Sequence, residues 1–501
     1  MTIRPLLRRL DLKAATDAEL GARTRLLPGL RAEQALSAHT DQVADLLRAS
    51  ISQAPDGARA TVLFAAKQRG ARPLNLWRLQ DRVLYRALAN YLRSQLPAGS
   101  GDRVEHSAFE RAPLDTPDAR YITATDISSY YVYVDHAILG DELIAQTGDY
   151  DTVTSTLRLL GQVMSGSVGL PQVHDSSDLL GDVYIDPIRR KLIRSGYPTE
   201  TYSDDFRICA TTLGGARKSL EMCAASAREL GLVLNEAKTF TYAREHYESS
   251  LEKFKVESRK VVEDNGLLSV AKFLFHGRYD DDVSNSVEPE SDSETTESVS
   301  ANSGHPDPEE IRAVWKLWSE STRDDLQKNP MVRQLLGQSL PELGVLGEIS
   351  PLDSIEDLVR STPELTPKVS EYLCQIARSH PDSRPVVAGK IVEALDSETC
   401  SRWQTVWLLH SSGTIGLEDQ KLTARLSQVL ESGDSVLTAY AAEALGQLGT
   451  VPAQKIAEGI DFVTPALKGS VVWAVGQIEP TLAEDVADSN LERLLITERS
   501  E

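Results

Sequence analysis

The stretch Thr201-Tyr-Ser-Asp-Asp-Phe-Arg-Ile-Cys209 places two adjacent carboxylates between two strand-like runs. Such a pair in a hairpin turn can face a cleft and bind a divalent cation through oxygen, the ligand atom that magnesium prefers. A Tyr-x-Asp-Asp match alone is a weak indicator, because average residue usage produces it by chance in roughly a few per cent of chains of this length. Its meaning therefore depends on the rest of the chain.

A further carboxylate, Asp126, stands 78 residues before Asp204, at the end of the apolar segment Tyr121-Ile-Thr-Ala-Thr-Asp126. If the two strands are neighbours in one sheet, Asp126 meets Asp204 and Asp205. Three carboxylates can hold two metal ions about 4 Å apart, one activating a 3′ hydroxyl and one stabilising the leaving pyrophosphate. The pattern predicts phosphoryl transfer by positioning and charge neutralisation. The alternative is that these acids are solvated turn residues.

Five segments, taken together, stand in a specific order. They are Lys67-Gln-Arg-Gly-Ala-Arg72-Pro-Leu, Asp126-x-x-x-Tyr130-Tyr131, Gly169-Leu-Pro-Gln172, Tyr202-Ser-Asp-Asp205 and Leu232-Val-Leu-Asn-Glu-Ala-Lys238-Thr. The set resembles the fingers segment and the A, B, C and D motifs of reverse transcriptases, over roughly residues 40 to 245. The resemblance implies an α+β right-hand-type polymerase with fingers and palm. It also implies a nucleotidyltransferase of the RNA-directed DNA polymerase type.

The resemblance assigns the metal ligands and catalytic acids by position. The catalytic residues would be Asp126, Asp204 and Asp205. The same three side chains, with the backbone carbonyl of Ile127, would bind two Mg²⁺ ions, for which Mn²⁺ is an alternative.

The resemblance also assigns five nucleotide contacts, namely Lys67, Arg72, Tyr131, Gln172 and Lys238. Lys67 and Arg72 would hold the triphosphate, which suits the preference of phosphate for cationic donors. Lys238 would assist the departing pyrophosphate. Tyr131 matches the bulky residue that lies under the sugar and excludes a 2′ hydroxyl, so the expected substrates are deoxynucleoside triphosphates. For the three cations, exposed surface charge is the alternative interpretation.

The chain departs from the family pattern at motif B. Most reverse transcriptases read Pro-Gln-Gly there, whereas this chain reads Pro171-Gln172-Val173-His174. Glycine lets the backbone approach a base or nucleotide closely, and a β-branched valine restricts both space and torsion. In addition, no long basic thumb helix is evident after the palm motifs. Conventional handling of a template is therefore in doubt.

An acidic, Ser-rich segment divides the sequence. The net charge of the whole chain is −21, but residues 1–120 hold 19 Lys and Arg against 13 Asp and Glu, and residues 278–310 hold one Arg against eleven acids. The acidic stretch has too few apolar residues to offset the entropy of ordering. The expected domains are fingers at 1–120, palm with a reduced thumb remnant at 121–277, an acidic disordered linker at 278–308, and a helical domain at 309–501.

The expected helical domain contains similar segments that end in Gly-Gln. The two segments are Ser435-Val-Leu-Thr-Ala-Tyr-Ala-Ala-Glu-Ala-Leu-Gly-Gln and Gly469-Ser-Val-Val-Trp-Ala-Val-Gly-Gln, and their Gly-Gln pairs are thirty positions apart. Small residues on one helix face suit helices stacked closely side by side, and the pattern resembles HEAT-type repeats. The fold expected after the palm is therefore an all-α HEAT-like repeat domain. A non-repetitive helical bundle is the alternative.

A palm with an altered motif B, little thumb and C-terminal helices resembles the abortive-infection reverse transcriptases of bacterial antiphage defence. That resemblance implies DNA synthesis that is untemplated or loosely templated, priming from a protein hydroxyl, and homo-oligomers. Tyr242 and Tyr247 are candidate primers from their place beyond the palm motifs. The expected partners are dNTPs, a DNA product and an RNA template. Two alternatives stay open: a conventional templated, retron-like enzyme, and a vestigial palm that serves as a partner-binding scaffold.

The expected location is the cytoplasm, without membrane attachment. The first residues lack the apolar core of a signal peptide, and no run of 18 apolar residues occurs. The four cysteines show no metal-binding spacing, so reduced thiols are expected.

Overall fold

The computed structural model describes residues 4–22, 26–54, 56–68, 70–97, 99, 104–251, 267, 270, 307–321 and 330–496. The chain forms two compact units, one of residues 1–24, 28–252 and 427–501 and one of residues 25–27 and 253–426. The expected acidic linker lies outside the described residues apart from 307 and 308, and the expected thumb remnant apart from 267 and 270. No helix in the described part of the chain is long and apolar enough to cross a membrane.

The first unit combines helices with a two-stranded and a four-stranded sheet. Its N-terminal elements are α1 (Arg4–Leu7), α2 (Leu12–Gly21), α3 (Arg31–Leu36), α4 (Thr40–Gln53), β1 (Thr61–Ala66), β2 (Ala71–Leu76), α5 (Leu79–Arg93) and α6 (His106–Asp115). Next come β3 (Tyr121–Asp126), α7 (Tyr130–Tyr133), α8 (His136–Thr147), α9 (Tyr150–Val163), α10 (Asp175–Arg194), β4 (Thr199–Tyr202), β5 (Asp205–Ala210), α11 (Leu213–Glu229) and β6 (Phe240–Ala243).

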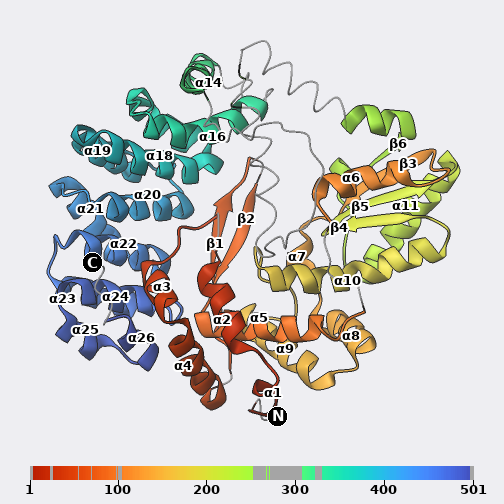
Figure 1. Ribbon diagram of the computed structural model, residues 1–501, viewed down its shortest axis with the longest axis horizontal. Coiled ribbons are helices and arrows are strands. Elements are labelled where there is room, and N and C mark those ends of the chain that lie inside the picture. Colours follow the sequence, from red (N-terminus) through yellow and green to blue (C-terminus); the bar gives the residue numbers. More distant parts are fainter. Residues whose placement is uncertain are drawn as a thin grey trace, which may run out of the picture. The chain divides into compact units, whose positions relative to one another are not determined.

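The four-stranded sheet is antiparallel, with the strand order β4-β5-β3-β6 (Figure 1). Asp126 of β3 is directly opposite Asp205 of β5, and Ile122 is opposite Cys209. Because side chains alternate between the two faces of a strand, these four residues lie on one face. Near the Cys209 end this face is covered by an apolar cluster that includes Tyr247. The sheet therefore carries two of the three acids to one face, at the end away from this apolar cluster.

Helices α10 and α11 pack against the same sheet (Figure 1). Phe206 and Ile208 of β5, which alternate with the residues of the acidic face, are fully buried. On β3, the hydroxyls of Thr123 and Thr125 lie 3.1 and 2.7 Å from those of Thr241 and Thr239, which joins β3 to β6. The strand that ends in Asp126 is thus held on both sides.

The first unit also contains C-terminal helices: α22 (Ser435–Leu448), α23 (Ala453–Ala457), α24 (Lys468–Ile478), α25 (Pro480–Val486) and α26 (Asn490–Leu494). The Glu443 carboxylate of α22 accepts hydrogen bonds from the backbone N–H groups of Arg31 (2.9 Å) and Ala32 (3.2 Å), at the start of α3. The Tyr440 hydroxyl donates to the carbonyl of Pro28 at 2.8 Å. Residues 427–496 therefore pack with the N-terminal part, which differs from the expected single helical domain at 309–501.

The second unit is helical in its described part. Its helices are α14 (Pro308–Glu320), α16 (Pro330–Val345), α17 (Ile355–Ser361), α18 (Thr366–Ser379), α19 (Arg384–Asp396) and α20 (Arg402–Ile415), while α21 (Gln420–Leu430) crosses the boundary between the units. Helices α14, α16, α18 and α20 pack in succession. At Gly344 of α16, an added Cβ would stand 2.8 Å from the carbonyl oxygen of Tyr372 in α18. Such close packing agrees with the expected role of small residues, while a HEAT-type repeat stays a prediction.

Candidate active site

The three acids predicted from the sequence converge at one end of the four-stranded sheet. Carboxylate oxygens of Asp126, Asp204 and Asp205 all lie within 4.8 Å of one another. Asp204 belongs to the turn between β4 and β5, where Ser203 has a left-handed backbone with φ of 51°. The N–H of Ile127 donates to the carbonyl of Asp204 at 3.1 Å, which ties this turn to the end of β3.

Asp126 is buried and held by the segment that precedes β6. The side-chain amide of Asn235 donates to its carboxylate at 3.0 Å, and the backbone N–H of Asn235 donates to its carbonyl at 2.7 Å. The Lys238 ammonium lies 3.1 Å from the same carboxylate. The sequence analysis assigned a nucleotide contact to Lys238 but no role to Asn235. Asn235 stands three residues before Lys238 in the same motif, and this position could have identified it.

The site is short of positive charge. Burial, together with the neighbouring charge of Asp126, raises the pKa of Asp204 to about 6. Burial also raises the pKa of Asp205, although the Arg207 guanidinium, 3.7 Å from its carboxylate, acts in the opposite direction. Burial by itself would lower the pKa of Lys238, but its hydrogen bond with Asp126 and the charges of all three acids together outweigh burial and raise the pKa.

This donor set fits divalent cations. Mg²⁺ and Mn²⁺ prefer carboxylate oxygens, and three crowded carboxylates are more numerous than the cations beside them. Burial and the charge of Asp126 raise the pKa of Asp204, and positive charge added beside it would favour its ionised form. The backbone of Ile127 is next to Asp126 in the chain, and its assignment as a ligand stays a prediction.

The hairpin of β1 and β2 brings two predicted phosphate-binding cations together. Lys67 follows β1, and its N–H donates to the carbonyl of Gly70 at 3.1 Å, whereas Arg72 is on β2 opposite Ala65. Burial and the nearby charges of Arg72 and Lys238 lower the pKa of Lys67, while Asp204 and Asp126 act to raise it. Lys67 is therefore within the electrostatic reach of the palm acids.

Tyr131 lies on α7, beside the acidic turn. Its hydroxyl is 2.5 Å from the Asp178 carboxylate and 3.2 Å from the Ser203 hydroxyl. Its carbonyl accepts a hydrogen bond of 2.8 Å from the N–H of Leu170, in motif B. The predicted sugar-sensing residue is thus close to the turn that carries Asp204. Sequence reasoning missed Asp178, which belongs to none of the motifs that it used.

Motif B keeps the backbone conformation that glycine would favour. Val173 has φ of 61°, which is the left-handed region and a genuine outlier for a β-branched residue. Gln172, one residue earlier, is half-buried, and His174, one residue later, is buried. The turn is therefore left-handed even with valine at this position, and the valine is strained there.

Of the two candidate priming tyrosines, Tyr247 is unsuitable. Its ring is buried, its hydroxyl donates to the carbonyl of Glu110 at 2.8 Å, and it accepts from Arg207 at 3.1 Å. Burial also raises its pKa. A hydroxyl in these bonds cannot reach a nucleotide, so this expectation was wrong. Tyr242 packs against the same apolar cluster.

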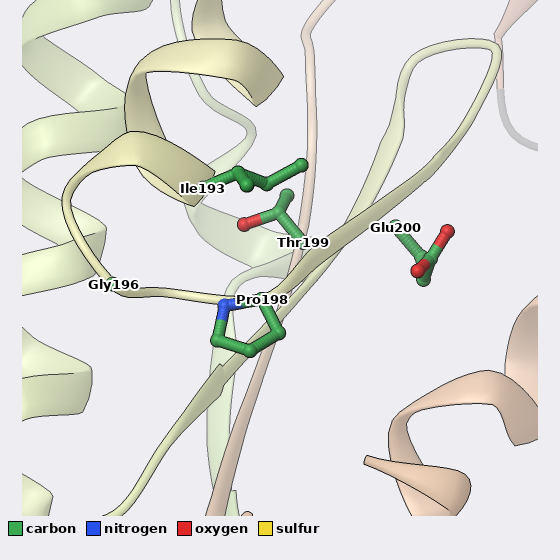
Figure 2. A pocket seen from close by; sticks show the side chains of 5 residues that line it. All are labelled: Ile193, Gly196, Pro198, Thr199 and Glu200. Atoms are coloured by element: carbon green, nitrogen blue, oxygen red, sulfur yellow. The ribbon is translucent and has the colours of Figure 1, made fainter.

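A shallow pocket lies where α10 ends and β4 begins. It is lined by Ile193, Gly196, Pro198, Thr199 and Glu200 (Figure 2). In Figure 2 the side chains of Ile193 and Thr199 lie close together, whereas Glu200 points away from them. None of these residues belongs to the carboxylate cluster, so the pocket is separate from the metal-binding candidates.

The comparison with protein families gives one match. Residues 65–262 match the family model described as reverse transcriptase (RNA-dependent DNA polymerase). No curated protein matches the chain. The matched span contains the three acids and the other residues assigned from the motifs. Residues 65–262 therefore form a reverse transcriptase domain, with the fingers and palm fold that such a domain implies.

Proposed function

We propose that the chain is an RNA-directed or template-independent DNA polymerase that works by a two-metal mechanism in bacterial antiphage defence. The observation that carries the catalytic part is the convergence of Asp126, Asp204 and Asp205 within 4.8 Å inside a reverse transcriptase domain. When bound, two divalent cations would activate the attacking 3′ hydroxyl and neutralise charge on the leaving pyrophosphate. In this proposal residues 1–120 are the fingers and residues 121–277 the palm.

The residues around the acids have separate tasks in this mechanism. Asn235 and Lys238 orient the Asp126 carboxylate, through the contacts of 3.0 and 3.1 Å. Lys67 and Arg72, on the hairpin, bind the triphosphate. After bond formation, the Lys238 ammonium can leave its ion pair with Asp126 and bind the pyrophosphate, because the lysine side chain is 63% exposed. Gln172 and Tyr131 contact the nucleotide base and sugar.

The catalytic proposal is tested by incorporation of labelled dNTPs onto nucleic acid. Incorporation should require Mg²⁺ or Mn²⁺ and stop with a chelator. Asp204→Asn and Asp205→Asn should each lower the rate by about a thousandfold or more, since each removes a charge from the metal site. The matched control is Asp118→Asn, on an exposed loop residue with φ of 58° that asparagine tolerates. Undiminished synthesis by both variants would remove these acids from the mechanism.

The defence role, the protein primer and relaxed template use rest on the resemblance to the abortive-infection group. The left-handed Val173 in motif B and the helices that follow the palm support it. Tyr133 and Tyr150 have exposed rings and are better candidates for priming than Tyr247. The decisive measurement is whether DNA is covalently attached to the protein purified from cells, and whether Asp204→Asn abolishes both the adduct and protection from phage.

Two other functions predict different results. A conventional retron-like enzyme would co-purify with one specific RNA and would copy it. A scaffold with a vestigial palm would protect cells equally well with Asp204→Asn. A homo-oligomer and a cytoplasmic location are further parts of the proposal, which light scattering of the purified chain and cell fractionation would check.

A further inference from the structure

The hydroxyl of Tyr131 has two hydrogen-bond partners from different elements. It lies 2.5 Å from Asp178 Oδ1, on α10, and 3.2 Å from Ser203 Oγ, in the turn between β4 and β5. A carboxylate only accepts, so the single tyrosine proton goes to Asp178. Ser203 must then donate its own proton to the tyrosine oxygen. The Tyr131 hydroxyl therefore donates one hydrogen bond and accepts another, and the acceptor of the first is a carboxylate oxygen.

The ring of Tyr131 is also confined by contacts along α10. At Gly181, one turn after Asp178, an added Cβ would stand 3.5 Å from Tyr131 Cε1 and 3.2 Å from Tyr130 Cε1. The rings of Tyr130 and Tyr131 pack with their centroids 5.2 Å apart. The Tyr130 hydroxyl donates to the carbonyl of Gly181 at 2.5 Å. One face of α10 therefore supports both rings, and Asp178 fixes the end of the second.

These contacts link the ring to the metal-binding turn. Ser203 immediately precedes Asp204, so a hydroxyl 3.2 Å from Ser203 Oγ is adjacent to the acids. Any movement of the Tyr131 ring changes the space beside a nucleotide bound there. Without a fixed hydroxyl, the ring could turn about χ1 and χ2 between rotamers.

We propose that Asp178 is a positioning residue for sugar discrimination, which with Ser203 holds the Tyr131 ring in the space that a ribose 2′ hydroxyl would occupy. The proposal rests on the proposed function of Tyr131 as the residue that senses the sugar. It adds that exclusion of ribonucleotides depends on a hydrogen bond as well as on the size of the ring. Removing the bond leaves the ring present but able to yield to a ribonucleoside triphosphate.

The test compares kcat/KM for dGTP and GTP in the full chain with Mg²⁺. Tyr131→Phe and Asp178→Ala should each reduce the preference for dGTP by about tenfold, which corresponds to about 1.4 kcal/mol. The loss should arise mainly from a lower KM for GTP. Asp178→Asn should restore most of the preference, because its amide oxygen can still accept the tyrosine proton.

Two further variants separate this role from general stability. The double variant Tyr131→Phe/Asp178→Ala should be no less selective than either single variant, since both remove the same bond. Tyr184→Phe is the matched control: it deletes another α10-associated hydroxyl, which bonds to the carbonyl of Leu230 and the N–H of Asp135. It should leave the dGTP preference intact.

The outcomes distinguish this proposal from the function on which it rests. If the wild-type chain incorporates neither nucleotide, the polymerase function fails and the positioning role with it. If the wild type prefers dGTP and Tyr131→Phe and Asp178→Ala keep that preference, only the positioning role of Asp178 is overturned. Should Asp178→Ala fail to fold, Tyr131→Phe and Ser203→Ala carry the same test from the other sides of the contact.

Discussion

Two groups of charged residues in the first unit differ in their balance of charge. At the end of β3, two cations, Lys238 and Arg207, contact the three acids of the metal-site candidate, and burial raises the pKa of Asp204. In the second group, Glu19 of α2 lies among three basic side chains. Burial alone would raise its pKa too, but these partners outweigh burial and the pKa is lowered.

The partners of Glu19 come from α5 and from motif B. Its carboxylate is 2.5 Å from Arg86 Nε, 3.5 Å from Arg82 Nε and 3.0 Å from His174 Nε2. His174 Nδ1 accepts a hydrogen bond from the N–H of Ser176, and Nε2 is the ring nitrogen next to Glu19. Arg86 donates a hydrogen bond to this carboxylate, and Arg82 and His174 add ion-pair contacts. The comparison teaches that clustered carboxylates which outnumber the cations in contact with them indicate a cation site, whereas one carboxylate among several basic side chains indicates a structural role.

The largest expected effect separates activity from stability at the first group. Asp204→Asn should lower polymerisation by about a thousandfold or more, yet without metal it should unfold at the same temperature as the wild type or higher. The reason is that the variant removes one of three mutually repelling charges. Thermal unfolding with a chelator and then with excess Mg²⁺ checks this. Mg²⁺ should stabilise the wild type more than the variant, and an equal gain in both would contradict a metal site here.

The opposite result is expected at the second group. Glu19→Ala leaves two arginines and His174 without their buried acceptor, so the free energy of unfolding should fall by about 3–5 kcal/mol. Denaturant unfolding followed by circular dichroism measures it. Asp56→Ala is the control, because it removes an exposed partner of Arg158 and should have little effect. A loss for Glu19→Ala as small as that of the control would refute the structural role of the cluster.

The first group could be predicted from sequence, whereas the second could not. Asp126, Asp204 and Asp205 belong to ordered motifs, and pairing of neighbouring strands was enough to bring them together. Glu19 and His174 are 155 residues apart, and no local pattern distinguishes either from a surface residue. Such a pair depends on tertiary packing, which neither spacing nor composition records.

The C-terminal helices show the same limit. The acidic segment suggested that everything after it forms one separate domain, but residues 427–496 pack with the N-terminal part. Small residues correctly indicated closely packed helices: an added Cβ at Gly446 of α22 would lie 2.7 Å from Ala474 of α24. The sequence pattern describes how one helix meets the next, but it does not identify a partner such as α3, some 400 residues away.

A third buried acid lies between the two extremes and gives a pH test. Glu443 accepts hydrogen bonds from the N–H groups of Arg31 and Ala32, but burial outweighs them and raises its pKa from 4.5 to about 7. Because the folded state binds this proton more tightly than the unfolded state, the protein becomes more stable as pH falls from about 7 towards 4.5. Above pH 7 the full cost of burying the charged carboxylate is present. That penalty is up to about 3 kcal/mol.

Glu443→Gln should therefore stabilise the protein at pH 8 and change little at pH 5, because glutamine keeps an acceptor for the two N–H groups without the charge. Unfolding of both proteins across this pH range provides the measurement. Arg31, Ser470 of α24 and Tyr440 of α22 are close to Glu443 and remain unchanged in the variant. A variant with the same pH dependence as the wild type would show that other groups titrate here.

The smallest expected effect concerns the residue beside the second group. Val173 is held at φ of 61°, next to His174, whose contact with Glu19 helps to secure the turn against the strain of a β-branched residue. Val173→Gly should relieve that strain and raise the free energy of unfolding by about 1 kcal/mol. Val168→Gly is the control, and it should lower the free energy of unfolding. Val168 is similarly exposed but has an extended backbone that bridges to Asp135, so glycine there only adds entropy to the unfolded chain. If Val173→Gly destabilises the protein as Val168→Gly does, the valine contributes contacts that exceed its strain. If Val173→Gly stabilises the protein, the valine lowers the stability of the fold. A benefit in nucleotide or template handling would have to offset that loss, and the use of a template by Val173→Gly is then the next measurement.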